Sequence, residues 1–335
     1  MGKVLVTGGA GYIGSHIVRA LADREVEVEV LDNLCEGHRE AIGDVRLIEA
    51  DFGDRELLDR ELAAGGYDFI VHMAAFCEVG ESMENPAKYY ENNITRSLAL
   101  LDAAHRHGVK GIVFSSTAAT YGEPQKLPIT EDHPQLPTNT YGETKLSFER
   151  ALRWYHHAYG MKFVALRYFN AAGAHPDGTI GEDHQPESHI LPRLLRGVLE
   201  GQQPVPIFGT DWPTPDGTCV RDYVHVLDLA QAHILAIDAM RDGRVEADAF
   251  NLGNGEGFSV LQVIDAVGKV TGHRPPTEDA PRRAGDPATL VASSDRVREV
   301  LGWKPEFPTI EGIVSTAWEW HRNCPQGYAT PGRKS

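Results

Sequence analysis

Residues 3–21 read KVLVTGGAGYIGSHIVRAL, and this stretch decides the fold expected for the amino-terminal half of the chain. Residues 3–7 are apolar and rich in β-branched side chains, whereas residues 15–21 have helical spacing. A glycine-rich turn between a strand and a helix lets the backbone approach a pyrophosphate, and the helix N-terminus offers free N–H groups to the phosphates. The glycines fit two spacings of this dinucleotide-binding pattern, with Gly11 and Gly14 preceded by either Gly8 or Gly9.

The next strand-like run, residues 26–31, ends at Asp32. In a dinucleotide-binding fold, a carboxylate at this point accepts hydrogen bonds from the two hydroxyls of the adenosine ribose and repels a 2′-phosphate. The loop, its flanking elements and the spaced acid together predict a site for NAD rather than NADP.

Apolar runs alternate with helical patterns through the first half of the chain. Strands are expected at residues 3–7, 26–31, 45–49, 68–73, 111–116 and 162–168. Helices are expected at residues 14–23, 54–63, 86–106 and 141–158. This alternation predicts an α/β fold with a Rossmann-type doubly wound parallel sheet, in which ligands bind at the carboxyl ends of the strands.

The composition changes after about residue 172, where Gly, Pro and Asp become frequent and the elements become shorter. Helices are expected there at residues 190–200, 228–241 and 259–270. We therefore expect an NAD-binding Rossmann domain over residues 1–172. A smaller C-terminal α/β substrate domain is expected over residues 173–335, with some of its segments returning to the first domain.

Composition and charge exclude several classes of protein. The 335 residues include 48 acidic and 32 basic side chains, for a net charge of −16, which argues against a nucleic-acid or membrane partner. No run approaches the 18 or so apolar residues that a membrane span needs. The four cysteines show no paired spacing, which fits a reducing cytoplasm and argues against a disulfide framework.

Fifteen histidines raise the question of a metal site. The pairs at residues 105/107, 156/157 and 184/189 lack the accompanying acid or cysteine pattern of a zinc site. No metal is therefore expected.

Tyr141 and Lys145 form a Y-x-x-x-K pair on a predicted helix, where residues four apart share one face. A lysine ammonium beside a phenol favours the phenolate and lowers the pKa of the tyrosine toward working pH. The strand at 111–116 ends in a run of hydroxyl side chains, Ser115 to Thr117, which can hold a substrate alcohol against the tyrosine oxygen. The pattern predicts proton removal from an alcohol beside a nicotinamide.

These motifs give the chain a specific resemblance to the extended short-chain dehydrogenase/reductase family, and within it to enzymes that invert C4 of UDP-hexoses. The matching stretches, in chain order, are TGGAGYIGSH, LDNL, HMAA (72–75), VGES (79–82), YYENN (89–93), FSSTAATYG (114–122), YGETK (141–145), LRYFNAAGAHP (166–176), GT-x-VRDYVHV-x-DLA (217–230), NLGNGEG (251–257) and RRAGD (282–286). The resemblance implies reversible conversion of UDP-galactose to UDP-glucose through a transient 4-keto sugar, with tightly bound NAD.

The same resemblance implies a role for individual residues. Tyr141 is the expected acid/base, Lys145 holds the cofactor ribose, and Thr117 lies beside the substrate hydroxyl. The cofactor is expected against Gly8, Gly11, Tyr12, Ile13, Gly14, Asp32, Asn33, Asp51, Phe52, Ala74, Ala75, Asn93, Ser115, Tyr141, Lys145 and Tyr168. The UDP-sugar is expected against Thr117, Tyr141, Asn170, His189, Ile190, Phe208, Arg221, Tyr223, Arg283 and Asp286. Relatives pair through helices of the nucleotide domain, so a homodimer is expected.

Two positions depart from the family pattern. Cys77 stands where some relatives place a lysine that reaches the cofactor phosphate. Leu290 stands where relatives place a residue that gates sugar size, and its intermediate size leaves open an alternative in which the substrate is a UDP-N-acetylhexosamine or another nucleotide sugar. A sister nucleotide-sugar dehydratase is disfavoured because Ala118 and Ala119, not carboxylates, follow Thr117. A non-catalytic NAD-binding protein is disfavoured by the presence of Thr117, Tyr141 and Lys145 together.

Overall fold

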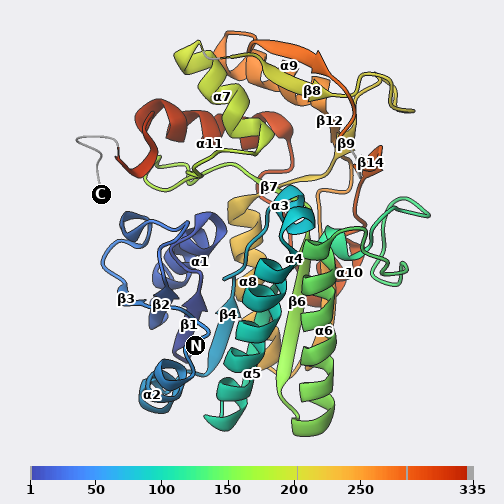
Figure 1. Ribbon diagram of the computed structural model, residues 1–335. Coiled ribbons are helices and arrows are strands. Elements are labelled where there is room, and N and C mark those ends of the chain that lie inside the picture. Colours follow the sequence, from blue (N-terminus) through green and yellow to red (C-terminus); the bar gives the residue numbers. More distant parts are fainter. Residues whose placement is uncertain (1, 202, 284–285, 330–335) are drawn as a thin grey trace.

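A computed structural model describes residues 2–201, 203–283 and 286–329 of the protein, which form two lobes stacked one above the other (Figure 1). The centre of the RRAGD motif and the end of the expected second domain lie outside the described residues. The large sheet and its helices form the lower lobe, and short strands with further helices form the upper one (Figure 1).

The lower lobe is built on a seven-stranded parallel sheet in the order β11-β6-β5-β4-β1-β2-β3. The strands are β1 Val4–Thr7, β2 Val28–Asp32, β3 Arg46–Glu49, β4 Phe69–His72, β5 Gly111–Thr117, β6 Lys162–Tyr168 and β11 Ala247–Leu252. The first six confirm the expected strands and the Rossmann-type fold class. The seventh was not expected, and it pairs with β6 although the two are far apart in the sequence.

Helices cover both faces of this sheet, as a doubly wound fold requires (Figure 1). One face packs on α1 Tyr12–Ala22, α8 Val226–Arg241 and α10 Asp295–Leu301. The other packs on α2 Arg55–Gly65, α5 Ser97–Arg106 and α6 Thr140–Tyr159. The helix expected over 86–106 is a continuous run of α4 Pro86–Tyr90, a π-helical segment Glu91–Arg96 and α5, preceded by α3 Val79–Glu84.

The upper lobe encloses a separate apolar core between α7 Ile190–Glu200, α9 Val260–Thr271 and α11 Ile310–Asn323. Its strands are β7 Asn170–Ala172, β8 Val205–Phe208, β9 Val220–Arg221, β10 Tyr223–His225, β12 Phe258–Ser259, β13 Thr277–Ala280 and β14 Thr289–Leu290.

Across both lobes, short 3-10 turns occur at Arg39–Ile42, Ala118–Thr120 and Gly327–Ala329. Throughout the described part of the chain, every helix is too short or too polar to span a bilayer.

Helix α6 is held against the sheet by a buried ion pair. Arg167 on β6 donates to both carboxylate oxygens of Glu149 on α6, at 2.9 and 2.6 Å, and both side chains are 1 % exposed. Arg167 also donates to the Tyr121 hydroxyl at 2.8 Å, and Ser116 on β5 donates to Glu149 at 2.5 Å. This network sets the position of α6 relative to β5 and β6, and so the position of every side chain that α6 carries toward the sheet edge.

We expect Glu149→Gln to lower the free energy of unfolding by about 3 kcal/mol, because it leaves the Arg167 charge buried without a counter-charge. Glu143→Gln is the matched control on the same helix, since Glu143 forms an exposed pair with Arg150 at 3.9 Å and its loss costs at most about 1 kcal/mol. Urea unfolding measures both differences. Equal effects for the two variants would contradict the anchoring role of the buried pair.

Candidate active site

The loop between β1 and α1 leaves a backbone surface without side chains. Gly8 has a φ of 70°, and a Cβ there would lie 2.6 Å from the backbone nitrogen of Ala74. A Cβ at Gly14 would lie 2.2 Å from the carbonyl oxygen of Gly8, so both positions exclude larger residues. Gly11 occupies the N-cap of α1 and has no side chain with which to cap the helix. This cradle fits a pyrophosphate against the start of α1.

Asp32 lies at the end of β2 with its carboxylate fixed by two backbone groups. Its Oδ2 accepts from the Ala10 N–H at 2.9 Å, and its Oδ1 accepts from the Leu34 N–H at 2.8 Å. Burial raises the pKa of Asp32, and these two N–H groups oppose that effect. Each oxygen retains a lone pair for a further donor, which fits the two hydroxyls of a ribose.

A cavity of about 380 Å³ runs along the carboxyl ends of the central strands. It brings together seventeen of the expected site residues: Gly8, Gly11, Tyr12, Ile13, Gly14, Asp32, Asn33, Phe52, Ala74, Ala75, Ser115, Thr117, Tyr141, Lys145, Tyr168, Asn170 and His189. Residues that were not among the expected site residues also line it: Leu31, Cys35, Glu36, Gly37, Ala50, Met73, Phe76, Cys77, Val79, Asn92, Phe169, Ala171, Glu182 and His184. The nucleotide loop and the Tyr/Lys helix therefore share one cavity.

Within the cavity, Lys145 is buried beneath Tyr141 and directed at the strand end. Its Nζ donates to the Ser115 carbonyl at 2.9 Å and lies 5.8 Å from the centre of the Tyr141 ring. The Tyr141 backbone N–H donates to the Ser82 hydroxyl at 3.2 Å. Thr117 accepts from the Ala119 N–H at 3.2 Å, and its own hydroxyl hydrogen-bonds to the Tyr141 phenol.

The net shift of the Tyr141 pKa in this structure is opposite to the expected lowering. Removal of the phenol from water raises the pKa of Tyr141 well above its usual range, and a hydrogen bond from Thr117 offsets this only in part. Burial also lowers the pKa of Lys145 to about 8, because the ammonium is desolvated as well. Proximity along one helix face therefore does not by itself produce a phenolate.

A second group of expected residues lies in the upper lobe and does not line the cavity. The Arg283 guanidinium stacks 4.4 Å from the centre of the Phe208 ring, and Arg221 lies 3.8 Å from Asp286. Tyr223 pairs in register with Asn170, which does line the cavity. Ile190, the first residue of α7, follows His189 of the cavity wall. The second group is thus joined to the cavity through the β7–β10 ribbon.

Asp51 and Asn93 also lie outside the cavity lining, although the sequence placed both beside the cofactor. Asp51 pairs with Arg96 and accepts from the Gly53 N–H at 2.8 Å. The Asn93 side chain exchanges two hydrogen bonds of 3.0 Å with the backbone of Phe76. The Asn93 contacts hold the loop that follows β4, which carries Ala74 and Ala75 to the cavity.

The two departures from the family pattern occupy different places. Cys77 is an exposed, free thiol on the cavity wall, so a neutral group stands at the lysine position. Leu290 lies on β14, in register with Arg221 on β9, and therefore belongs to the upper-lobe group.

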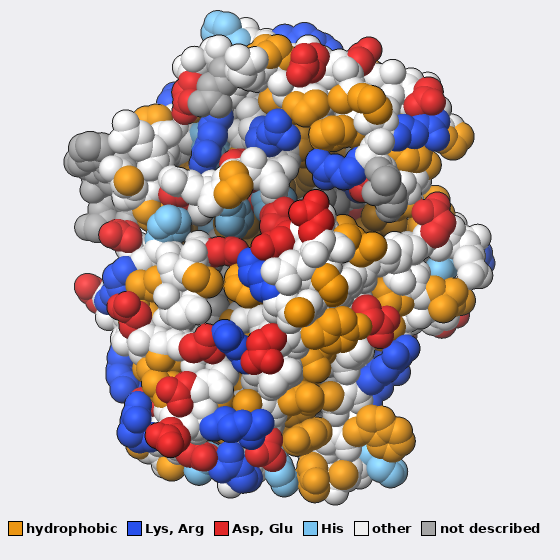
Figure 2. Space-filling model, viewed as in Figure 1, with side chains coloured by type: hydrophobic (Ala, Val, Ile, Leu, Met, Phe, Trp, Pro, Cys, Tyr) orange, Lys and Arg blue, Asp and Glu red, His pale blue; other side chains and the backbone are white. Residues whose placement is uncertain are grey.

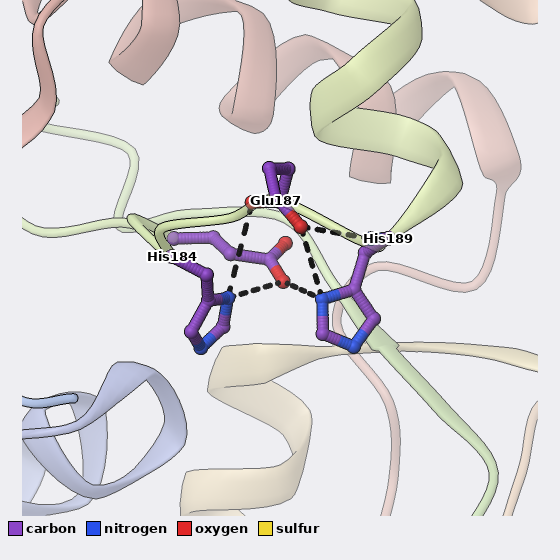
Figure 3. A group of neighbouring side chains, drawn as sticks. His184, Glu187 and His189 are labelled. Carbon is purple, nitrogen blue, oxygen red and sulfur yellow. Dashed lines mark hydrogen bonds and ion pairs between the residues drawn. The ribbon is translucent and has the colours of Figure 1, made fainter. Parts of the chain in front are cut away.

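Two histidines set aside in the sequence lie at the cavity with two glutamates between them, as Figure 3 shows for His184, Glu187 and His189. Glu182 Oε1 lies 3.4 Å from His184 Nδ1 and 2.9 Å from His189 Nδ1. The stated reason for expecting no metal, a lack of accompanying acids, is therefore incorrect. The signal was the spacing in EDHQPESH, where acids precede and separate the histidines.

Charge is concentrated in this group, here named the His–Glu quartet: Glu182, His184, Glu187 and His189. Burial lowers the pKa of both imidazoles, but the two carboxylates outweigh it and raise each pKa above the usual histidine range. Without a metal the quartet is thus a pair of imidazolium ions against a pair of carboxylates.

Comparison with known proteins places this fold and site in a family. Residues 4–253 match the model of the NAD dependent epimerase/dehydratase family. A UDP-glucose 4-epimerase of Halalkalibacterium halodurans is 52% identical over 331 residues, covering 98% of this chain and 98% of that protein. The chain belongs to the NAD dependent epimerase/dehydratase family.

Solved structures agree with the family. The UDP-glucose 4-epimerase of Brucella ovis in complex with NAD is 42% identical, with a TM-score of 0.92 over 95% of this chain and 98% of that one. The enzyme of Bifidobacterium longum in complex with NAD+ and UDP is 38% identical, with a TM-score of 0.92 over 97% of this chain and 100% of that one.

The lowered pKa of Lys145 predicts a pH-dependent stability. Between about pH 8 and 10.5 the unfolded lysine keeps a proton that the folded one releases, so the free energy of unfolding rises with pH across this window. Lys145→Met removes this contribution. We therefore expect the free energy of unfolding of the wild type to increase, relative to that of Lys145→Met, when the pH is raised from 7.5 to 9.5. Urea unfolding of cofactor-free protein measures this difference. A difference that stays constant would contradict the desolvation of Lys145.

Proposed function

We propose that this protein interconverts UDP-galactose and UDP-glucose by reversible inversion at C4, with NAD as a retained cofactor. The observation that carries the proposal is the single cavity that holds the nucleotide cradle, Asp32, Thr117, Tyr141 and Lys145. Relatives of about 50% identity over nearly the full chain are UDP-glucose 4-epimerases, and solved relatives contain NAD. Dehydratase and non-catalytic alternatives have no comparable support.

Inversion of an unactivated carbon requires a temporary ketone. The chemistry that NAD supplies is acceptance of the C4 hydride and its return to the opposite face of the sugar. Tyr141 takes the C4 hydroxyl proton as the hydride leaves and gives it back when the ketone is reduced, so the proton and the hydride are both restored in each turnover. Thr117, whose hydroxyl hydrogen-bonds to the Tyr141 phenol, lines the same cavity and is placed to contact the same sugar hydroxyl.

Tyr141 must lose its proton against the unfavourable effect of burial. A cationic partner lowers this cost, and Lys145 is the buried cation that lies beneath the tyrosine ring. Ser115 holds the lysine in place through its carbonyl oxygen at 2.9 Å. The oxidised nicotinamide would add a second positive charge near the phenol. The phenolate is therefore proposed to form when NAD is bound.

The upper-lobe group is proposed to hold the UDP part of the substrate. The Arg221 and Arg283 guanidinium groups suit a diphosphate, since their planar forks remain charged and match phosphate oxygens. Phe208 and Asp286 supply an apolar face and a carboxylate for the uridine. Anchoring through the nucleotide leaves the hexose free to turn over in the cavity, so that either face of the 4-ketone is reduced.

The structure supports a division of labour between residues 1–172, as the NAD-binding domain, and residues 173–335, as the substrate domain. The chain crosses between lobes, because α8, β11 and α10 come from the second half and pack on the large sheet. We therefore assign these three segments of the second half to the first domain. Three free cysteines, Cys35, Cys77 and Cys219, support a cytoplasmic location.

A homodimer through the α5–α6 face is proposed from its exposed apolar side chains. Leu98 on α5 and Trp154 and Tyr159 on α6 are exposed, Trp154 to 70 %. Hydrophobic side chains gather over this part of the surface (Figure 2). Exposed aromatic side chains of this kind are typical of subunit interfaces.

We expect Tyr141→Phe to lower kcat for conversion of UDP-galactose to UDP-glucose by about 10²- to 10⁴-fold, because the proton acceptor is lost. Chromatography of the hexose products measures turnover, and absorbance of bound NADH on addition of UDP-hexose measures the hydride step. Tyr155→Phe, farther along α6, is the control and retains full activity. Turnover near wild type in Tyr141→Phe would remove Tyr141 from its proposed role.

We expect Trp154→Glu to convert the dimer to a monomer, because two buried charges would face each other across a two-fold interface. Size-exclusion chromatography with light scattering measures the mass in solution. Lys269→Ala, an exposed change on α9 in the upper lobe, serves as the control and leaves the mass unchanged. A monomeric wild type, or a dimeric Trp154→Glu variant, would place the interface elsewhere or exclude it.

A further inference from the structure

The His–Glu quartet is an arrangement that the proposed reaction does not require. The side chains of Glu182, His184, Glu187 and His189 each offer one ligand atom, and all of these atoms lie within 4.8 Å of one another. They come from one short segment that precedes α7, and two of its four members are histidines whose Nδ1 atoms face the carboxylates (Figure 3). Such a set differs from an acidic patch, because imidazole nitrogen and carboxylate oxygen are both zinc ligands.

The nitrogen–oxygen distances match the edges of a tetrahedral site. Glu182 Oε1 lies 3.4 Å from His184 Nδ1 and 2.9 Å from His189 Nδ1. Glu187 oxygens lie 3.8 Å from His184 Nδ1 and 3.2 Å from His189 Nδ1. Four ligands at the usual zinc distances of about 2.0–2.1 Å from a central ion are separated by about 3.4 Å. The observed distances lie on both sides of that value, so small side-chain movements complete the site.

Two of the ligand atoms have no other partner. Within the described ranges, nothing hydrogen-bonds to His184 Nδ1 or Glu187 Oε2, although both atoms are buried from solvent. A buried polar atom without a hydrogen bond is costly, and each such atom calls for an explanation. A cation at the centre of the quartet satisfies both atoms at once.

We propose that Glu182, His184, Glu187 and His189 bind one Zn²⁺ ion per chain, through the two Nδ1 atoms and one oxygen of each carboxylate. Zinc binds imidazole through a nitrogen without a proton, so any proton on either Nδ1 is released on binding, and the two positive charges of the ion balance the two carboxylates. Four protein ligands make a closed site, which is typical of a structural zinc rather than a catalytic one.

The consequence of such a site is a fixed wall of the cavity. Glu182, His184 and His189 line the cavity, and the His184 ring meets the edge of Tyr12 with 6.3 Å between ring centres. The metal would tie residues 182–189 together at the point where the upper lobe meets the nucleotide loop. This proposal stands apart from the epimerase reaction, because its test reads metal binding and not turnover.

The first experiment uses full-length protein without an affinity tag, freed of metal with a chelator, and titrated with Co²⁺ as a spectroscopic substitute for Zn²⁺. We expect the intense visible absorption of tetrahedral cobalt, saturating at one ion per chain and displaced by one equivalent of Zn²⁺. Because the wild type is used, this result does not depend on the folding of any variant. Absent or weak octahedral absorption at saturation would overturn the proposal.

The second experiment locates the ion. His184→Ala and Glu187→Gln each remove one ligand, and we expect either change to weaken Zn²⁺ binding by at least about 100-fold in calorimetric titration. His175→Ala is the matched control, since His175 forms a similar pair with Asp177 at 2.7 Å outside the quartet. Circular dichroism and thermal melting verify that each variant is folded. Binding unchanged in both ligand variants would overturn the proposal.

The free thiols provide the remaining check. Cys35 and Cys77 also line the cavity and are alternative zinc ligands. Thiolate ligation to cobalt produces a strong near-ultraviolet charge-transfer band, whereas a His and Glu ligand set does not. A titration without that band supports the quartet, and one with it assigns the metal to cysteine and refutes the proposal.

Discussion

The buried pair between Arg167 and Glu149 is the constraint on which the rest of the site depends. It ties α6 to β6, while Ser116 adds β5 and Tyr121 adds β11 through a 2.7 Å hydrogen bond to Asn251. Two fully desolvated charges have a strict geometry, because any displacement leaves one of them unpaired. The position of α6 relative to the sheet is therefore fixed. Tyr141 and Lys145, which α6 carries, are thereby placed together at the carboxyl ends of the strands.

The cofactor nucleotide and the substrate nucleotide are proposed to bind in different parts of the molecule. The nucleotide cradle, Asp32 and the Tyr/Lys helix surround one cavity, whereas the arginines proposed for the diphosphate lie in a separate lobe joined by the β7–β10 ribbon. A firm hold on both nucleotides with few contacts to the hexose is what a reaction with a freely turning ketone requires. The segment from Glu182 to His189 lies where the two lobes meet. A rigid segment there would fix the position of the upper lobe relative to the nucleotide loop.

Sequence reasoning found most of the fold and a large part of the cavity. Six strands and the nucleotide loop follow from apolar runs and glycine spacing, which are local properties. The strand β11 was missed because its polar members, Asp248 and Asn251, interrupt the apolar pattern while their partners come from distant parts of the chain. The quartet was missed because histidines were compared with zinc patterns one pair at a time, and the glutamates between them were not counted as ligands.

The sequence by itself determined the Rossmann-type sheet and the glycine-rich loop, and it supplied the side chains proposed to be reactive, since each follows from residue type and short-range spacing. Only the tertiary structure decided which of them share a cavity, how deeply Tyr141 and Lys145 are buried, and which carboxylates face His184 and His189. Burial and charge environment depend on everything packed around a group. That is why the spacing of Tyr141 and Lys145 located the site, while the direction of the tyrosine pKa could be known only from the folded chain.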